Sequence, residues 1–215
     1  MFRIITVERE YGCGAAAIAA HLAERLGWKL WDHSLTEEIA KIAKVDCGAV
    51  QKHEERVDSR FYRLSKVFWR GSYERALPVG ESDIFDADCM VFTMEQITAK
   101  IAQEGNAVVV GRGSPFFLRE RADTFRVFLY APRPEKIRRL LASGMSEDEA
   151  GESVDTVDRE RMAFIKHYFN ADWPTRALYH MMINTEIGDE LVIATILDSM
   201  EKLQLSPLPV RTSIR

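Results

Sequence analysis

The fold of this chain is decided by one stretch near its start, Ile4-Ile5-Thr6-Val7-Glu8-Arg9-Glu10-Tyr11-Gly12-Cys13-Gly14-Ala15-Ala16-Ala17-Ile18. An apolar run ends, two glycines follow, and an alanine-rich helical pattern begins at once. Glycines let backbone N–H groups approach an anion, and the N-terminus of a helix adds about half a positive charge. The stretch therefore predicts a phosphate-binding loop made of Gly12, Cys13, Gly14, Ala15, Ala16 and Ala17.

The loop lacks the charged residue that a triphosphate-binding loop normally carries. In such loops a lysine after the last glycine contacts the phosphates, and a nearby Ser or Thr binds Mg²⁺. Three alanines, Ala15 to Ala17, stand in their place. Cys13 has two interpretations. It is a small residue that fills a tight turn, or a thiol whose pKa is lowered by the helix N-terminus for redox or covalent chemistry.

The composition is that of a soluble globular domain. The chain has 215 residues, 47% of them hydrophobic, and a net charge of -4, which argues against a general nucleic-acid surface. Residues 13, 47 and 89 are the three cysteines; they form no CxxC pair, which favours a reducing cytoplasm and predicts no metal site. No apolar run reaches the length of a membrane span, and the start lacks the pattern of a signal peptide.

Apolar runs alternate with helical patterns along the chain. We expect strands at 2–7, 28–31, 107–110, 125–130 and 181–185, with helices at about 15–26, 35–43, 92–102, 132–142 and 189–203. The acidic, glycine-containing segment 143–156 is expected to be flexible, before a helix that runs to about Phe169. This alternation predicts an α/β sandwich of three layers around a five-stranded parallel sheet.

Residues 45–90 interrupt the alternation between the second and third strands. The segment is densely charged, then aromatic, then rich in Gly, Pro and acidic residues. We expect helices with a mobile connection there, which either form a hairpin over one face of the sheet or act as a substrate lid. The tail, 206–215, is expected to be flexible.

The glycine loop fits two nucleotide-binding folds. The run from Gly12 to Ala17 satisfies the dinucleotide pattern GxGxxG/A, and Asp32 lies twenty residues after Gly12, where a ribose-binding acid belongs. Against that interpretation, we expect residues 8–11 to form a loop between the strand and the first glycine, as a triphosphate requires. The phosphate-loop interpretation is therefore favoured over an NAD-binding oxidoreductase.

Several charged residues are expected at the same rim of the sheet. The first three strands lead to the glycine loop, Asp32 and Arg112, and the carboxyl ends of parallel strands share one edge. Arg112 stands between two glycines, so we expect an exposed guanidinium that suits a phosphate. Asp158 and Arg161 are one helical turn apart on one face. Each charge, taken singly, is equally well explained as a solvated side chain or a local ion pair.

The chain resembles the cytidylate kinase-like family, P-loop relatives of the nucleoside monophosphate kinases. Five motifs carry the resemblance in the right order over about residues 2–203: Ile-Thr-Val-Glu-Arg-Glu-Tyr-Gly-Cys-Gly, Leu-Gly-Trp-Lys-Leu-Trp-Asp-His, Val-Val-Val-Gly-Arg-Gly, Val-Asp-Arg-Glu-Arg and Ile-Asn-Thr. The resemblance implies one kinase-like domain over 1–205. Its core is 1–32 and 93–205, with a helical NMP-binding region at about 33–92 and a lid at about 143–160.

The resemblance also implies ATP and Mg²⁺ as cofactors and CMP or dCMP as the phosphate acceptor. It places Asp32 and Arg112 at the acceptor and Asp158 and Arg161 at the substrates and phosphates, with Arg159 beside them on the lid. Arg112 precedes a glycine where cytidylate kinases have an Asp that reads cytosine, so the base specificity stays open.

Two functions therefore remain, transfer of a phosphoryl group from ATP to a small acceptor and nucleotide binding without catalysis, as in a sensor. Arg9 lies inside the loop, where it either replaces the missing lysine together with Arg161 or pairs with a neighbouring acid such as Glu8. The sequence leaves open whether the chain forms a homodimer.

Overall fold

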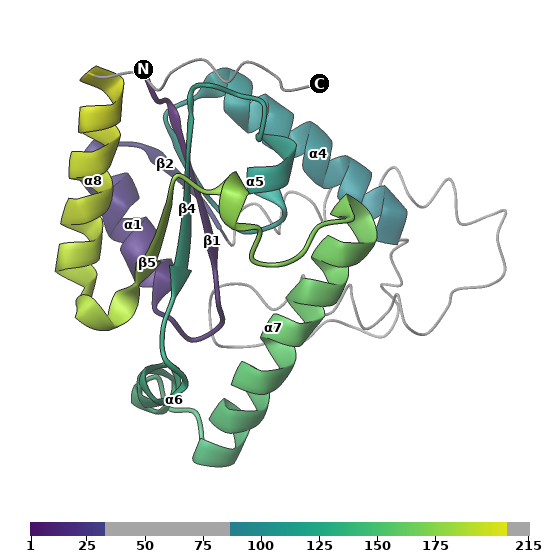
Figure 1. The fold of residues 1–215 in the computed structure, drawn as a ribbon, viewed down its shortest axis with the longest axis vertical. Helices are drawn as coiled ribbons and strands as arrows, with labels where there is room; N and C mark the ends of the chain where they lie inside the picture. The colour runs from purple at the N-terminus through teal and green to yellow at the C-terminus, as the bar shows by residue number, and fades with distance from the viewer. Residues whose placement is uncertain (33–86, 206–215) are drawn as a thin grey trace, which may run out of the picture.

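Five strands form one parallel sheet in the computed structural model, which describes residues 1–32 and 87–205 (Figure 1). Within these ranges the strand order is β2-β3-β1-β4-β5, and every pair is parallel. The strands are β1 (Ile4–Arg9), β2 (Lys29–Trp31), β3 (Ala107–Val110), β4 (Thr124–Tyr130) and β5 (Met181–Asn184). The sheet and its alternation with helices confirm the predicted α/β fold.

The central strand, β1, is longer than predicted. It continues through Glu8 and Arg9, which lie opposite Phe128 and Leu129 of β4 and are buried. Two charged residues are tolerated there because they pair with each other and because the sheet satisfies their backbone groups. The predicted loop over residues 8–11 is therefore wrong, and only Glu10 and Tyr11 separate the strand from Gly12.

Helices cover both faces of the sheet (Figure 1). One apolar core lies between the sheet and helices α1 and α8, and a second lies between the sheet and helices α4, α5 and α7. This layering confirms the predicted sandwich. The helices are α1 (Ala15–Leu26), α4 (Ala87–Glu104), α5 (Ser114–Phe117), α6 (Arg133–Ala142), α7 (Glu147–Phe169) and α8 (Asp189–Leu205), with 3-10 turns at Arg176–Leu178 and Thr185–Ile187.

The acidic segment after α6 is mostly helical, not flexible as predicted. Helix α7 begins at Glu147, and residues 143–146 alone connect it to α6. Ser146 caps the helix, since its hydroxyl accepts the N–H of Glu149 while the Glu149 carboxylate accepts the N–H of Ser146. Acidic side chains in the first turn also interact favourably with the helix dipole. The acidic composition therefore marks a helix start.

Some expectations lie outside the described residues. The insertion between β2 and β3 falls mostly on residues 33–86, and the tail on 206–215, so the predicted helix near 35–43, the substrate lid and the flexible tail stay predictions. In the two ranges that are described, no helix has the length and apolar character that crossing a membrane requires.

Candidate functional site

The glycine loop joins the end of β1 to the start of α1 through two left-handed residues. Gly12 has φ +75° and Gly14 has φ +81°, values that other residues adopt only with strain. Gly14 is the N-cap of α1, and no side-chain cap bonds to that helix end. The first N–H groups of a helix have no partner inside it. The start of α1 therefore offers backbone donors to an anion.

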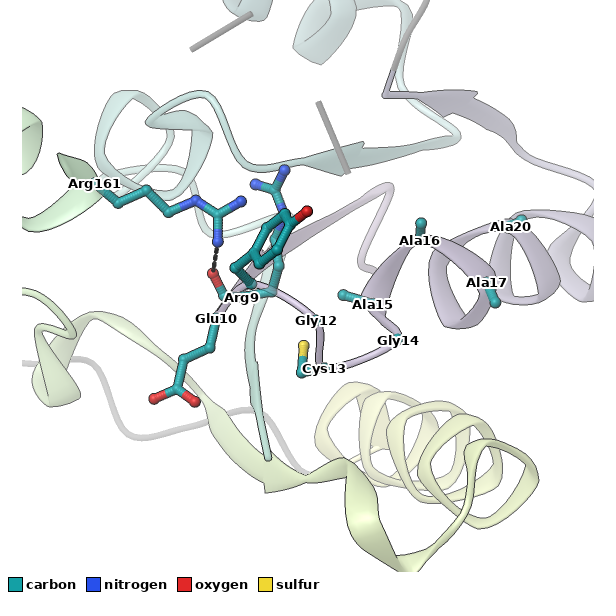
Figure 2. Close-up of a pocket in the computed structure, with 11 residues that line it drawn as sticks. Arg9, Glu10, Gly12, Cys13, Gly14, Ala15, Ala16, Ala17, Ala20 and Arg161 are labelled. Carbon is teal, nitrogen blue, oxygen red and sulfur yellow. Dashed lines mark hydrogen bonds between the residues drawn. The ribbon is translucent and has the colours of Figure 1, made fainter. Parts of the chain in front are cut away.

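A pocket of about 300 Å³ opens over this loop (Figure 2). All six predicted loop residues line it, and their role in phosphate binding stays a prediction. The remaining lining residues come from the end of β1, from α1 and from α7. They are Arg9, Glu10, Tyr11, Ala20 and Arg161.

Arg9 lines the pocket and is also ion-paired. Its side chain is buried, and its Nη1 lies 3.6 Å from Oε1 of Glu8. The same guanidinium crosses to the end of β3, where a Cβ added to Gly111 would lie 1.7 Å from Nη1. The ion-pair interpretation of Arg9 is therefore confirmed. Arg9 also lines the pocket, and its replacement of the loop lysine stays a prediction.

Asp158 and Arg161 of α7 hold the loop from the side. Nη1 of Arg161 donates to the Arg9 carbonyl oxygen at 3.0 Å, as Figure 2 shows, and to Oδ1 of Asp158 at 3.1 Å. The same Oδ1 accepts the Tyr11 backbone N–H at 2.8 Å. The predicted pairing on one helix face is confirmed, and the pair fixes the main chain between β1 and Gly12.

Arg112 is buried, so the predicted exposed guanidinium is wrong. It is 5% exposed and has φ +62°, and the glycines on either side of it, Gly111 and Gly113, have positive φ as well. Burial lowers the pKa of Arg112, Arg9 and Arg161 lower that pKa further, and Asp32 raises it. Burial and Arg9 also lower the pKa of Arg161.

Arg9 and Arg112, which are buried, and Arg161, which is partly exposed, thus form one group of like charges, which we call the arginine cluster. Like charges in a low-dielectric site disfavour one another, and an anion placed among them relieves that repulsion. Asp32, 3% exposed just after β2, contributes one compensating charge. The cluster combines residues from β1, the β3–α5 turn and α7, as the sequence predicted for the rim.

Arg159 does not join the arginine cluster. It is exposed on α7 and does not line the pocket, and its charge helps to lower the pKa of Asp155. It follows Asp158 by one residue, and adjacent residues on a helix do not share a face. Its assignment to the substrate stays a prediction.

Two cations that the sequence reading missed lie under the loop. Nζ of Lys136 lies 2.6 Å from Glu10 and 3.3 Å from Asp158. The Arg139 guanidinium packs against Gly14, and a Cβ built on that glycine would lie 2.1 Å from Nη1 of Arg139. Lys136 had a readable signal, because it precedes the buried Leu140 by four residues and so shares its helix stripe.

Cys13 packs beneath the loop as a small neutral residue. It is 1% exposed, its carbonyl accepts the Thr185 hydroxyl at 2.7 Å, and burial raises the pKa of its thiol to about 11. The alternative of a low-pKa thiol is therefore wrong. Desolvation of the thiolate outweighs the helix N-terminus and the nearby arginines.

The order of the strands separates the two nucleotide-binding folds. In the dinucleotide-binding fold the first strand lies beside the second. Here β3 lies between β1 and β2. The strand order therefore shows that the NAD interpretation is wrong. The loop over residues 8–11, which was expected to argue against that interpretation, does not form, because β1 continues through Arg9.

Residues 4–187 match the cytidylate kinase-like family. The chain belongs to this family. No curated protein sequence gives a match. Among solved structures, an uncharacterized protein from Eubacterium ventriosum is similar at 20% identity and TM-score 0.66, over 94% of this chain and 99% of that one.

Shikimate kinase from Acinetobacter baumannii, solved with shikimate, is similar at 16% identity and TM-score 0.53, over 95% of this chain and 96% of that one. Identities this low show the fold alone. This chain and these structures share one fold, that of the P-loop kinases.

Mg²⁺, which the family implies, does not fit the glycine loop of this member. Ala15, Ala16 and Ala17 offer no side-chain oxygen at the start of α1. The carboxylates of the loop region are engaged by cations: Glu8 by Arg9, Glu10 by Lys136, and Asp158 by Lys136 and Arg161. The described residues also include no group of three or more His, Cys, Asp or Glu side chains placed to hold a metal.

Proposed function

We propose that this protein transfers the γ-phosphoryl group of ATP to a small acceptor. A nucleoside monophosphate, CMP or dCMP by family resemblance, is the first acceptor to test. One observation carries the proposal: backbone donors of the glycine loop and the guanidiniums of Arg9 and Arg161 line the same pocket. Catalysis of phosphoryl transfer consists largely of positioning and of charge stabilisation, and this pocket provides both.

The proposed roles combine the family resemblance with the positions of the side chains. Arg9 and Arg161 contact the donor phosphates, and Asp158 orients Arg161 and the loop. Arg112 and Asp32 hold the acceptor, and Arg159, which is exposed and outside the pocket, is assigned to the substrate by the resemblance alone. An oxygen of the acceptor phosphate attacks the γ-phosphorus, so that a new O–P bond forms while the bond from the γ-phosphorus to the β–γ bridging oxygen breaks and ADP leaves. An arginine placed at the transferring phosphoryl group contributes about 10³–10⁵ in rate in GTPases.

A second candidate is nucleotide binding without transfer. Ala15 and its two neighbours favour it, because they supply neither the lysine nor the hydroxyl that normally faces the triphosphate. The arginine cluster favours transfer, because burying two of its like charges, Arg9 and Arg112, costs stability that a site for the base and ribose alone does not require.

The test is a phosphoryl-transfer assay with ATP across nucleoside monophosphates and shikimate, with Mg²⁺ and with chelator, beside ATP binding by calorimetry. If the protein is a kinase, we expect one acceptor to be phosphorylated, at a rate that falls at least tenfold in both Arg112→Ala and Arg161→Ala. Lys166→Ala, an exposed cation on the same helix as Arg161, serves as the matched control and keeps its rate. Tight ATP binding without transfer to any acceptor would reject the kinase and favour nucleotide binding without catalysis.

A further inference from the structure

The start of α1 contains nothing that could hold a metal ion. Ala16 is half-buried and Ala17 exposed, and both line the pocket, so a side-chain oxygen at either position would face the phosphates. Methyl groups cannot coordinate Mg²⁺, which binds oxygen ligands in near-octahedral geometry.

The carboxylates nearest the loop are engaged in ion pairs with cationic side chains. Glu10 is the acid that lines the pocket, and Figure 2 shows its carboxylate on the side of the loop away from the Arg161 guanidinium. There it forms an ion pair of 2.6 Å with the buried Lys136. Asp158 accepts from Tyr11, Lys136 and Arg161 at once. Recruiting either acid to a metal would break a buried ion pair, which is costly.

Positive charge at the pocket comes instead from guanidiniums. Arg9 and Arg161 line it, and Arg161 is fixed by two hydrogen bonds, to the Arg9 carbonyl and to Asp158. A guanidinium can bind two phosphate oxygens in parallel, and it neutralises phosphate charge that a metal ion would otherwise neutralise. Two such groups can therefore balance much of the charge of a triphosphate without a metal.

We propose that Arg9 and Arg161 replace both the loop lysine and the loop-held Mg²⁺, so that this pocket binds the nucleoside triphosphate in its metal-free form. The inference rests on the proposed function to the extent that the ligand is a nucleotide. The pocket then takes a polyphosphate anion whose charge is balanced by protein, and added Mg²⁺ draws free ATP away from it.

The first experiment uses the unaltered chain. The affinity for ATP is measured by calorimetry in chelator and in excess Mg²⁺, with NaCl added to the chelator sample until the ionic strengths match, because screening alone weakens phosphate binding. We expect ATP to bind at least as tightly in chelator as in Mg²⁺. Binding that requires Mg²⁺ overturns this inference and leaves the proposed function intact. Absence of binding in both conditions overturns both.

The second experiment asks whether the arginine and the metal substitute for each other. Arg161→Met is expected to weaken ATP binding in chelator about ten- to hundredfold, the effect of losing a charged hydrogen bond to phosphate. Mg²⁺ should recover part of that loss, so the variant gains a metal dependence that the parent lacks. Arg161→Lys, which keeps the charge, should lose less than Arg161→Met.

Lys166→Met is the matched control for charge, because Lys166 is an exposed cation further along α7 and outside the pocket. It should bind ATP as the parent does in both conditions. Thermal melts of all variants identify any that fail to fold, and the measurement on the unaltered chain needs none of them. Equal ATP affinity of Arg161→Met and the parent in chelator would overturn the proposal.

Discussion

Two turns of this molecule have the same backbone design and opposite chemistry. Gly12 and Gly14 lead from β1 into α1, and Gly111 and Gly113 lead from β3 into α5; all four have positive φ, and the second of each pair is the helix N-cap. Between the first pair stands Cys13, a neutral residue buried under the loop. Between the second pair stands Arg112, a buried cation that adopts positive φ itself.

The two turns therefore contribute different chemical groups to the site. The first turn supplies backbone N–H groups and an open pocket, and it carries no charge of its own. The second turn brings a guanidinium to the arginine cluster, at the cost of a left-handed non-glycine residue, about 1–2 kcal/mol, and of burying a charge. Strain of this kind persists where the surroundings enforce it, most often at functional sites.

The largest effect is expected when a side chain is added to either turn. A Cβ at Gly14 would lie 2.1 Å from Nη1 of Arg139, and one at Gly111 would lie 1.7 Å from Nη1 of Arg9. Gly27, with φ +63° and nothing within 4 Å, is the control that has the strain without the contact. We expect Gly27→Ala to lower the free energy of unfolding by about 1–2 kcal/mol.

Gly14→Ala and Gly111→Ala should cost about 1–3 kcal/mol more than Gly27→Ala. The first displaces Arg139 from Glu135 and Asp189, and the second displaces the buried Arg9 from Glu8. Urea denaturation of the three variants gives the comparison. Equal losses in all three would mean that neither turn depends on the close approach of an arginine.

The next effect separates the two turns by ligand. If the second turn serves the acceptor, Arg112→Ala weakens acceptor binding about ten- to hundredfold, the effect of removing one charged hydrogen bond. ATP binding should change by less than about threefold, since Arg112 does not line the pocket over the glycine loop. Titrations of each ligand alone measure both values. A larger loss for ATP than for the acceptor would reverse the assignment of the two turns.

A smaller effect tests how α7 supports the first turn. Asp158→Asn keeps an acceptor for the Tyr11 N–H but removes the charge that faces Lys136 and Arg161, so we expect a loss of about 1–3 kcal/mol in unfolding free energy. Asp155→Asn, on the same helix, breaks an exposed pair with Arg133 and should cost about 0–1 kcal/mol. Similar losses would show that the buried pair is no more important than the exposed one.

The sheet and the glycine loop could be predicted because their signals are local. The apolar run 107–110 matches β3 residue for residue, and Gly27 ends α1 as its position indicates. The end of β1 could not be predicted in this way. Glu8 and Arg9 have the composition of a loop, and only their pairing with β4 and with each other makes them a strand.

Side-chain burial in the site depends on contacts distant in sequence. Arg112 reads as an exposed residue between glycines, yet Asp32, Arg9 and Arg161, from three other segments, surround it electrostatically. Lys136 follows the same rule, since its partner Glu10 belongs to a turn 126 residues earlier in the chain. The sequence placed the charges at the correct rim and could not say which of them fold inward.

The last prediction concerns Cys13, the neutral counterpart of Arg112. Burial raises the pKa of its thiol to about 11, so at pH 8 its reaction with a disulfide reagent should be slower than that of an ordinary exposed thiol by about two orders of magnitude from ionisation alone. The measurement uses a Cys47→Ser, Cys89→Ser background, and urea should restore the ordinary rate.

The raised pKa of Cys13 also makes the free energy of unfolding depend on pH. Because the unfolded thiol ionises at the lower pH, the contribution of Cys13 is complete below about pH 9 and is lost as pH rises toward 11. Rapid labelling of the folded protein at pH 8 would mean that the first turn opens to solvent and that its cysteine is not a neutral packing residue.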